Sequence, residues 1–237
     1  MVVHCKFDFS MTFIDDLDHD FCFTINDLPQ PSCNTPEFLT ENCRRSRVLL
    51  LKVVTPRLVL AERLLAEYPH LNIKIIHLIR DPRAIIASAR RMPWDKNISL
   101  NDENILCSNL RSDMKTGDVI ERTHPNSYRR MRYEDLAMAP LEIMKKIFKF
   151  LDEPFTPRVA TFMRKHTHAL KEEADIHELL STKKMSKKLS FQWRLRNNFS
   201  EVEKIQDACR DVIQSMHLKM FTSAHEYATQ PLDVRLS

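Results

Sequence analysis

The feature that most restricts the fold of this sequence is a strand pattern that passes directly into a helix pattern, and does so twice. An apolar run at residues 48–54 precedes a helical pattern with Thr55 as N-cap and Pro56 at the first helical position. A second run, at residues 72–79, ends in Arg-Asp-Pro-Arg, where Asp81 is the N-cap of the next helix. This alternation is typical of a parallel sheet covered by helices, so we predict an α/β fold.

The remaining elements fit the same fold class. Residues 101–122 predict a helix, and residues 126–133 predict a third strand, which alternates and should therefore lie nearer to a sheet edge. The stretch "APLEIMKKIFKFLDEP" predicts an amphipathic helix, helical patterns continue beyond residue 157, and another helix is expected from about residue 200 to 216.

Composition divides the chain into three parts. Residues 1–46 are rich in Pro, Asp, Asn and Cys and predict an irregular segment of the same domain as residues 47–218, while residues 219–237 are expected to be a C-terminal tail. No apolar run approaches the ~20 residues that a membrane helix needs, so we expect no membrane span in this chain. We expect no signal peptide at its beginning, because acidic residues interrupt the apolar ones.

Composition also excludes several kinds of site. The single glycine, Gly117, rules out a Walker-type phosphate loop and a dinucleotide fingerprint, which both need several glycines. The net charge of +4, from 36 basic and 32 acidic side chains, is too balanced for a dedicated nucleic-acid binder, although a local basic pocket remains open. None of the six cysteines forms a C-x-x-C pair, so we expect no zinc site.

The cysteines do not show whether the protein resides in an oxidising or a reducing compartment, because six residues are compatible with disulfides or with free thiols. Two N-x-S/T sequons, at Asn97 and Asn198, favour an oxidising compartment, but sequons also arise by chance.

The Arg-Asp-Pro-Arg turn could hold an anion. Ligands of open α/β sheets bind beyond the C-terminal strand ends, where Arg80 and Arg83 would flank a helix N-terminus. The planar guanidinium suits phosphate, and the Ser88 hydroxyl could reach the same anion only if the loop folds back along the helix. In the alternative interpretation, Asp81 simply caps the helix and the arginines are solvated or paired with acidic side chains.

The stretch "IHLIRDPRAIIASAR" resembles the 3′-phosphate-binding segment of sulfotransferases that use PAPS (3′-phosphoadenosine 5′-phosphosulfate). It is most similar to the Golgi carbohydrate sulfotransferases of the galactose/GlcNAc/GalNAc 6-O type. Further stretches resemble that family in the same order over roughly residues 47–218: "VLLLKVVTPRL", "NILCSNLRSD", "YRRMRYEDLAMAP" and "QWR…EVEKIQDAC". The resemblance implies a P-loop-NTPase-like sulfotransferase fold, a parallel sheet flanked by helices.

The resemblance also implies which residues bind the cofactor. Arg80 and Ser88 match the residues that contact the 3′-phosphate, and Asp81, Pro82 and Arg83 lie in the same segment.

Other side chains have weaker assignments. The resemblance places Tyr133 near the adenine, where a phenol can pack on a base, and a core tyrosine with a satisfied hydroxyl is the alternative. Glu134 and Asp135 are adjacent and point apart, so we interpret them as structural groups that cap or pair with arginines. Trp193 and Arg194 could close over a nucleotide, but we favour a packing role.

Spacing and the resemblance together suggest two disulfides, Cys33–Cys43 and Cys107–Cys209. His77 lies in a buried strand pattern, which favours a core residue over a catalyst, and no catalytic residue is assigned.

The implied activity is transfer of sulfate from PAPS to a sugar hydroxyl of a glycan, in the Golgi lumen, without a metal. The full-length parent would be anchored by a single membrane span. Members of this family bind the 5′-phosphosulfate with a glycine-rich loop that precedes the matched stretches, whereas no glycine precedes Gly117 in this chain. We therefore expect an N-terminally truncated sulfotransferase that lacks the first strand and that loop, and that transfers sulfate poorly.

Two other functions stay open at this point. The chain could be a non-catalytic relic that binds a nucleotide or a protein partner. It could also bind polyanions through residues 181–196, where cations alternate with aromatic side chains, although a solvated basic face explains that pattern as well.

Overall fold

The structure is a computed structural model that describes residues 40–41, 44–53, 56–91, 102–167 and 185–236. It divides into two units, Met1–Thr55 and Pro56–Ser237, and the α/β core lies in the second.

The strand predicted at residues 48–54 is wrong for the part that the structure describes. Residues 48–53 have no regular structure, and their apolar side chains are exposed, with Leu50 at 84% and Leu51 at 72%. A strand needs a neighbour that satisfies its backbone hydrogen bonds, and the two described strands pair only with each other. The apolar pattern alone therefore does not produce a strand here.

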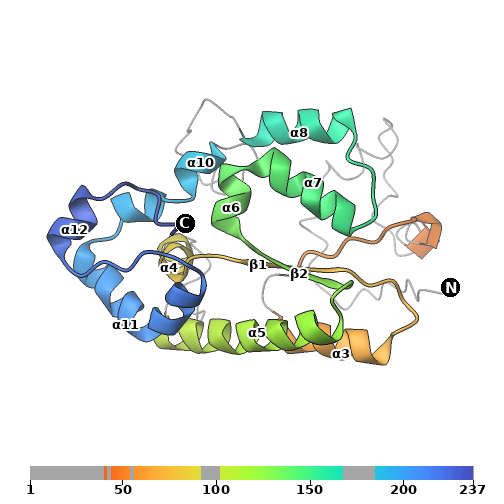
Figure 1. Cartoon of the computed structure of the whole chain (residues 1–237), viewed down its shortest axis with the longest axis horizontal. Coiled ribbons are helices and arrows are strands. Elements are labelled where there is room, and N and C mark those ends of the chain that lie inside the picture. The colour runs from red at the N-terminus through yellow and green to blue at the C-terminus, as the bar shows by residue number, and fades with distance from the viewer. Residues whose placement is uncertain (1–39, 42–43, 54–55, 92–101, 168–184, 237) are drawn as a thin grey trace. The chain divides into compact units, whose positions relative to one another are not determined.

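Two parallel strands form the sheet of the second unit, β1 (Ile75–Ile79) and β2 (Tyr128–Arg132), which run side by side in Figure 1. Their register pairs Ile75 with Tyr128 and Ile79 with Arg132. Helices α4 and α5 lie between the strands in the chain, as a parallel connection requires. The α/β prediction is confirmed, with fewer described strands than we expected.

The helices occupy most of the rest of the second unit. Their bounds are α3 (Val59–Glu67), α4 (Pro82–Ala89), α5 (Glu103–Thr123), α6 (Tyr133–Met138), α7 (Pro140–Phe150), α8 (Pro157–Thr167), α10 (Ser186–Leu189), the 3-10 helix η3 (Gln192–Leu195), α11 (Phe199–Ser215) and α12 (Ala224–Thr229). The short helix α6, directly after β2, was not predicted.

The first helix begins later than predicted. Helix α3 starts at Val59 with Leu58 as N-cap, so Pro56 lies before the helix. The reason is a tertiary contact, because the Arg57 side chain and the Leu58 backbone N–H both donate to Asp113 on α5 at 3.0 Å.

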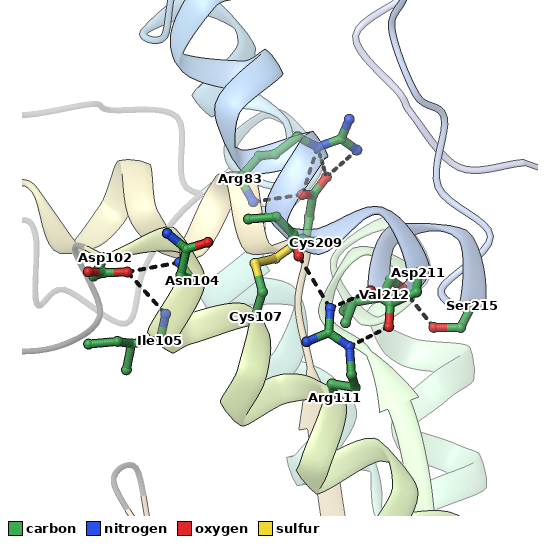
Figure 2. Close-up of a disulfide and its surroundings, with 12 residues drawn as sticks. Arg83, Asp102, Asn104, Ile105, Cys107, Arg111, Cys209, Asp211, Val212 and Ser215 are labelled. Atoms are coloured by element: carbon green, nitrogen blue, oxygen red, sulfur yellow. Dashed lines mark hydrogen bonds and ion pairs between the residues drawn. A yellow bond between two sulfur atoms is a disulfide. The ribbon is translucent and has the colours of Figure 1, made fainter.

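The main core joins α4, α5 and α11. The disulfide Cys107–Cys209 ties α5 to α11 inside this core, with 5.1 Å between the Cα atoms (Figure 2), and the implied pairing is confirmed. Beside it, Arg111 on α5 donates to Asp211 at 2.6 Å and to the Ala208 carbonyl at 3.2 Å. The other suggested pair, Cys33–Cys43, lies outside the described residues.

The segment after residue 218 belongs to the core, although we expected a tail. Phe221 and Val234 are buried in the main cluster. The buried Arg194 guanidinium donates to backbone carbonyls of this segment, including Tyr227 and Gln230. An arginine is a donor in all five N–H positions, so its burial requires these carbonyls nearby.

Candidate functional site

Arg80 and Tyr133 meet where the two strands end. Each directly follows its strand, and the register makes them neighbours, with the Arg80 guanidinium carbon 4.4 Å from the centre of the Tyr133 ring. This is a cation–π contact. The Arg80 Nε is buried and has no hydrogen-bond partner in the structure, and within the described ranges no acidic side chain forms an ion pair with Arg80. Among the described residues, the alternative in which Arg80 is paired with an acidic side chain does not hold, and the alternative in which it is solvated stays open.

Arg80 Nε shares this lack of a partner with other buried donors of the described residues, such as Arg194 Nε, but Arg80 is the one that lies at the C-terminal strand edge, where ligands of α/β sheets bind. The contact with Tyr133 is a cation–π contact and not a hydrogen bond to an acceptor atom, so the Arg80 N–H groups can still donate to a ligand. Arg80 therefore has the chemistry of an anion-binding group.

Ser88 lies on α4, partly buried, and its hydroxyl makes no hydrogen bond to any described residue. By helical rise it lies about 9 Å further along α4 than Pro82. The structure does not bring Ser88 and Arg80 into contact, so a shared ligand would have to reach along the helix.

Asp81 and Pro82 hold the start of α4. The Asp81 carboxylate accepts from the Arg83 backbone N–H at 2.9 Å, and Pro82 occupies the first turn, so the predicted helix start is confirmed. The Asp81 carbonyl accepts from Ala84 and Ile85, both at 3.0 Å. The first-turn amides that we expected to face an anion are thus already used within the protein.

Arg83 is a structural residue here, contrary to the prediction that it contacts a phosphate. Its side chain is 0% exposed and forms a two-pronged ion pair with Asp81, with Nη2 at 2.8 Å from the carboxylate. Its Nη1 donates to Gln206 at 3.0 Å and to the Lys219 carbonyl at 2.8 Å. With all three nitrogens engaged, Arg83 can reach a ligand only by breaking a buried pair.

Glu134 is the residue whose position sequence reasoning missed. Its side chain is completely buried, and one carboxylate oxygen accepts from the Asp81 backbone N–H at 3.0 Å while the other has no hydrogen-bond partner. Burial, and then the nearby Asp81 carboxylate, raise the pKa of Glu134 to about 7, while Arg80 opposes the shift. Only the strand register, which places Glu134 beside Asp81, could have revealed this contact.

The other assignments near the strands agree with the structure. Asp135 pairs with Arg132 at 2.7 Å and with Arg235 at 3.3 Å, as expected for a carboxylate that holds arginines. His77 bonds to the Tyr128 hydroxyl at 2.7 Å, and burial, followed by the charge of Arg130, lowers its pKa to about 4. A neutral, hydrogen-bonded histidine fits a core role.

The aromatic residues of the basic segment at 181–196 are buried. Trp193 lies over the Arg83 guanidinium at 4.7 Å, and Phe191 belongs to the same core cluster. These rings cannot stack on nucleic-acid bases without unfolding the core, which removes the main support for a polyanion site. The packing role that we favoured for Trp193 and Arg194 agrees with these contacts.

The described residues offer neither a cluster of metal ligands nor a membrane-spanning helix. Within the described ranges, no three or more His, Cys, Asp or Glu side chains are grouped so that they could hold a metal ion. Among the same residues, no helix has both the length and the apolar character to span a bilayer.

Comparison with known proteins gives one family. Residues 12–220 match the family described as "Sulfotransferase domain". No solved structure matches significantly.

Curated relatives agree with this family. Carbohydrate sulfotransferase 3 of Rattus norvegicus is 30% identical over 194 residues, which cover 75% of this chain and 40% of that protein. Carbohydrate sulfotransferase 1 of Rattus norvegicus is 30% identical over 203 residues, which cover 78% of this chain and 48% of that protein. Carbohydrate sulfotransferase 5 of Mus musculus is 28% identical over 228 residues, which cover 87% of this chain and 58% of that protein. The chain thus spans between 40% and 58% of the length of these relatives. With the family match extending over most of its length, the chain belongs to the sulfotransferase family.

Proposed function

We propose that this chain binds PAPS at the C-terminal edge of β1 and β2 and serves the transfer of sulfate to a sugar hydroxyl of a glycan. The observation that carries the proposal is the Arg80 guanidinium, which has a buried nitrogen without a partner and lies on the Tyr133 ring. PAPS supplies the sulfuryl group, and the protein residues bind and orient the nucleotide.

The available groups fit the nucleotide. Arg80 would donate to the 3′-phosphate, and the Ser88 hydroxyl, which is also without a partner, would donate to the same end of the ligand. Tyr133 is partly exposed and could pack against the adenine with the part of its ring that Arg80 leaves free. Asp81, Pro82, Arg83 and Glu134 would position this site without touching the ligand.

The glycan acceptor and the compartment rest on the relatives. The matched relatives are named carbohydrate sulfotransferases, which supports a sugar hydroxyl as the acceptor. The core disulfide between Cys107 and Cys209 supports an oxidising compartment such as the Golgi lumen.

The experiment is a calorimetric titration of adenosine 3′,5′-bisphosphate, the product that PAPS leaves, into the purified chain and three variants. Arg80→Ala should weaken binding about 10- to 150-fold, because a hydrogen bond to a charged group contributes about 1.5–3 kcal/mol. The affinity of Arg80→Lys should lie between those of the wild type and Arg80→Ala, because lysine keeps the charge but lacks the planar guanidinium.

The matched control is Arg91→Ala, which removes the same charge from an exposed side chain just beyond the end of α4. This variant should bind like the wild type. A folded wild-type chain that does not bind, or an Arg80→Ala variant that binds equally well, would contradict the proposal.

A further inference from the structure

Asn198 occupies the N-cap of α11 and also begins the sequon Asn-Phe-Ser. Its side-chain Oδ1 accepts from the Glu201 backbone N–H at 2.9 Å, and a Glu201 carboxylate oxygen accepts from the Asn198 backbone N–H at 3.0 Å. This reciprocal pair is a capping box, which fixes the direction of the Asn198 side chain.

The nitrogen of the same amide is free. Asn198 is exposed, and its Nδ2 makes no hydrogen bond to any residue that the structure describes. Ser200, the third residue of the sequon, is exposed as well. The neighbouring Asn197 shows the contrast, because its Nδ2 is buried and it does not begin a sequon.

We propose that Asn198 carries an N-linked glycan. Its Nδ2 would form a bond to the anomeric carbon of an oligosaccharide on a lipid diphosphate. The bond from that carbon to the diphosphate oxygen breaks, the lipid diphosphate leaves, and the amide nitrogen loses one proton. Because the cap uses only Oδ1, the glycan and the capping box can exist together.

A second observation supports the compartment that this modification requires. The sequon is glycosylated only in proteins that enter the secretory pathway. The buried disulfide Cys107–Cys209 forms under the oxidising conditions of the same pathway. The sequon begins at the N-cap of α11, the disulfide joins α5 to α11, and the two features point to this compartment independently.

A glycan on Asn198 would lie near the end of α4 that carries Ser88 and far from Arg80. Glu201 of the capping box pairs with Arg90 at 3.0 Å, so the start of α11 lies beside the C-terminal end of α4. Arg80 precedes the other end of α4, about two helical turns away. This inference does not depend on the proposed nucleotide binding.

The test expresses the full chain behind a cleavable secretion signal in a eukaryotic host, in an Asn97→Gln background that removes the other sequon. Digestion with an N-glycan amidase, followed by peptide mass spectrometry, identifies the modified residue, because the amidase converts a glycosylated Asn to Asp. Two variants should lose the glycan while keeping the cap: Ser200→Ala, which retains the Asn198 oxygen, and Asn198→Asp, which retains a carboxylate oxygen. Ser200→Thr should keep the glycan.

The expected result is one amidase-sensitive glycan at residue 198 in the starting chain and in Ser200→Thr, and none in the other two variants. The Cys107–Cys209 disulfide reports in each sample whether the chain has passed through the oxidising compartment. A chain that carries the disulfide but no glycan at Asn198 would overturn the proposal, as would a chain that is recovered with neither.

Discussion

Gly117, the only glycine of the chain, lets α5 approach β2 closely, and we predict that Gly117→Ala destabilises the protein. A Cβ atom at this position would lie 3.1 Å from Tyr128 Cζ, 2.5 Å from Arg130 Nη2 and still closer to the Tyr128 hydroxyl. Tyr128 is completely buried, and its hydroxyl bonds to His77 at 2.7 Å. The ring therefore cannot withdraw without disturbing its neighbours.

Favourable and unfavourable effects together decide whether Gly117→Ala raises or lowers the free energy of unfolding. Alanine should gain about 1 kcal/mol over glycine inside a helix. Overpacking of a filled site costs about 1–3 kcal/mol, and loss of the hydrogen bond between Tyr128 and His77 costs about 0.5–1.5 kcal/mol more. We expect a net loss of about 1–3 kcal/mol, or a melting temperature lower by about 2–10 °C in a chain of this size.

The assay is urea unfolding of a double-mutant cycle with Tyr128→Phe, which removes the hydroxyl that the new methyl group meets. In the Phe background, Gly117→Ala should cost at least about 1 kcal/mol less than in the wild type. Ser112→Ala, on the exposed side of the same helix, measures the helix propensity effect without a steric clash. Additive single effects, or a stabilised Gly117→Ala protein, would rule out a steric clash between residue 117 and the Tyr128 hydroxyl.

Three further predictions concern the site and the core. The pKa of Glu134 is raised to about 7 in the folded chain. The folded state therefore holds the proton more tightly than the unfolded state, so the free energy of unfolding of the wild type should decrease as the pH rises from about 4.5 to about 7. In urea titrations, Glu134→Gln should gain up to about 3 kcal/mol over the wild type by pH 8. Replacing Cys107 and Cys209 by serine should lower the free energy of unfolding by about 3–5 kcal/mol, and an unchanged melting temperature would argue against the disulfide. Arg83→Met should destabilise by about 3–5 kcal/mol by leaving a buried carboxylate unpaired, whereas Arg80→Ala should unfold at nearly the wild-type temperature; equal effects would contradict their different roles.

Local sequence rules predicted the start of α4 correctly. Asp81 as N-cap and Pro82 in the first turn depend on contacts within a few residues, so the sequence contains the information. The prediction of a disulfide between Cys107 and Cys209 was correct for a different reason, because it came from the resemblance to sulfotransferases together with the spacing.

Long-range contacts decided the elements that were predicted wrongly. The apolar run at residues 48–53 has the composition of a strand, but no described strand pairs with it. Arg80 and Arg83 look equivalent in the sequence, and only the fold shows that Arg83 meets Gln206 and the Lys219 carbonyl while Arg80 has a nitrogen without a partner. The role of an arginine near a ligand thus depends on the acceptors that distant segments bring to it.

We propose that Arg80 receives the 3′-phosphate of the nucleotide. The most direct test compares the dissociation constants of adenosine 3′,5′-bisphosphate and adenosine 5′-monophosphate for the wild type and for Arg80→Ala. We predict that the 3′-phosphate strengthens wild-type binding at least about tenfold, that Arg80→Ala loses this gain, and that its affinity for the monophosphate changes little. A gain from the 3′-phosphate that is equally large in Arg80→Ala would contradict the account, because the phosphate would then bind elsewhere.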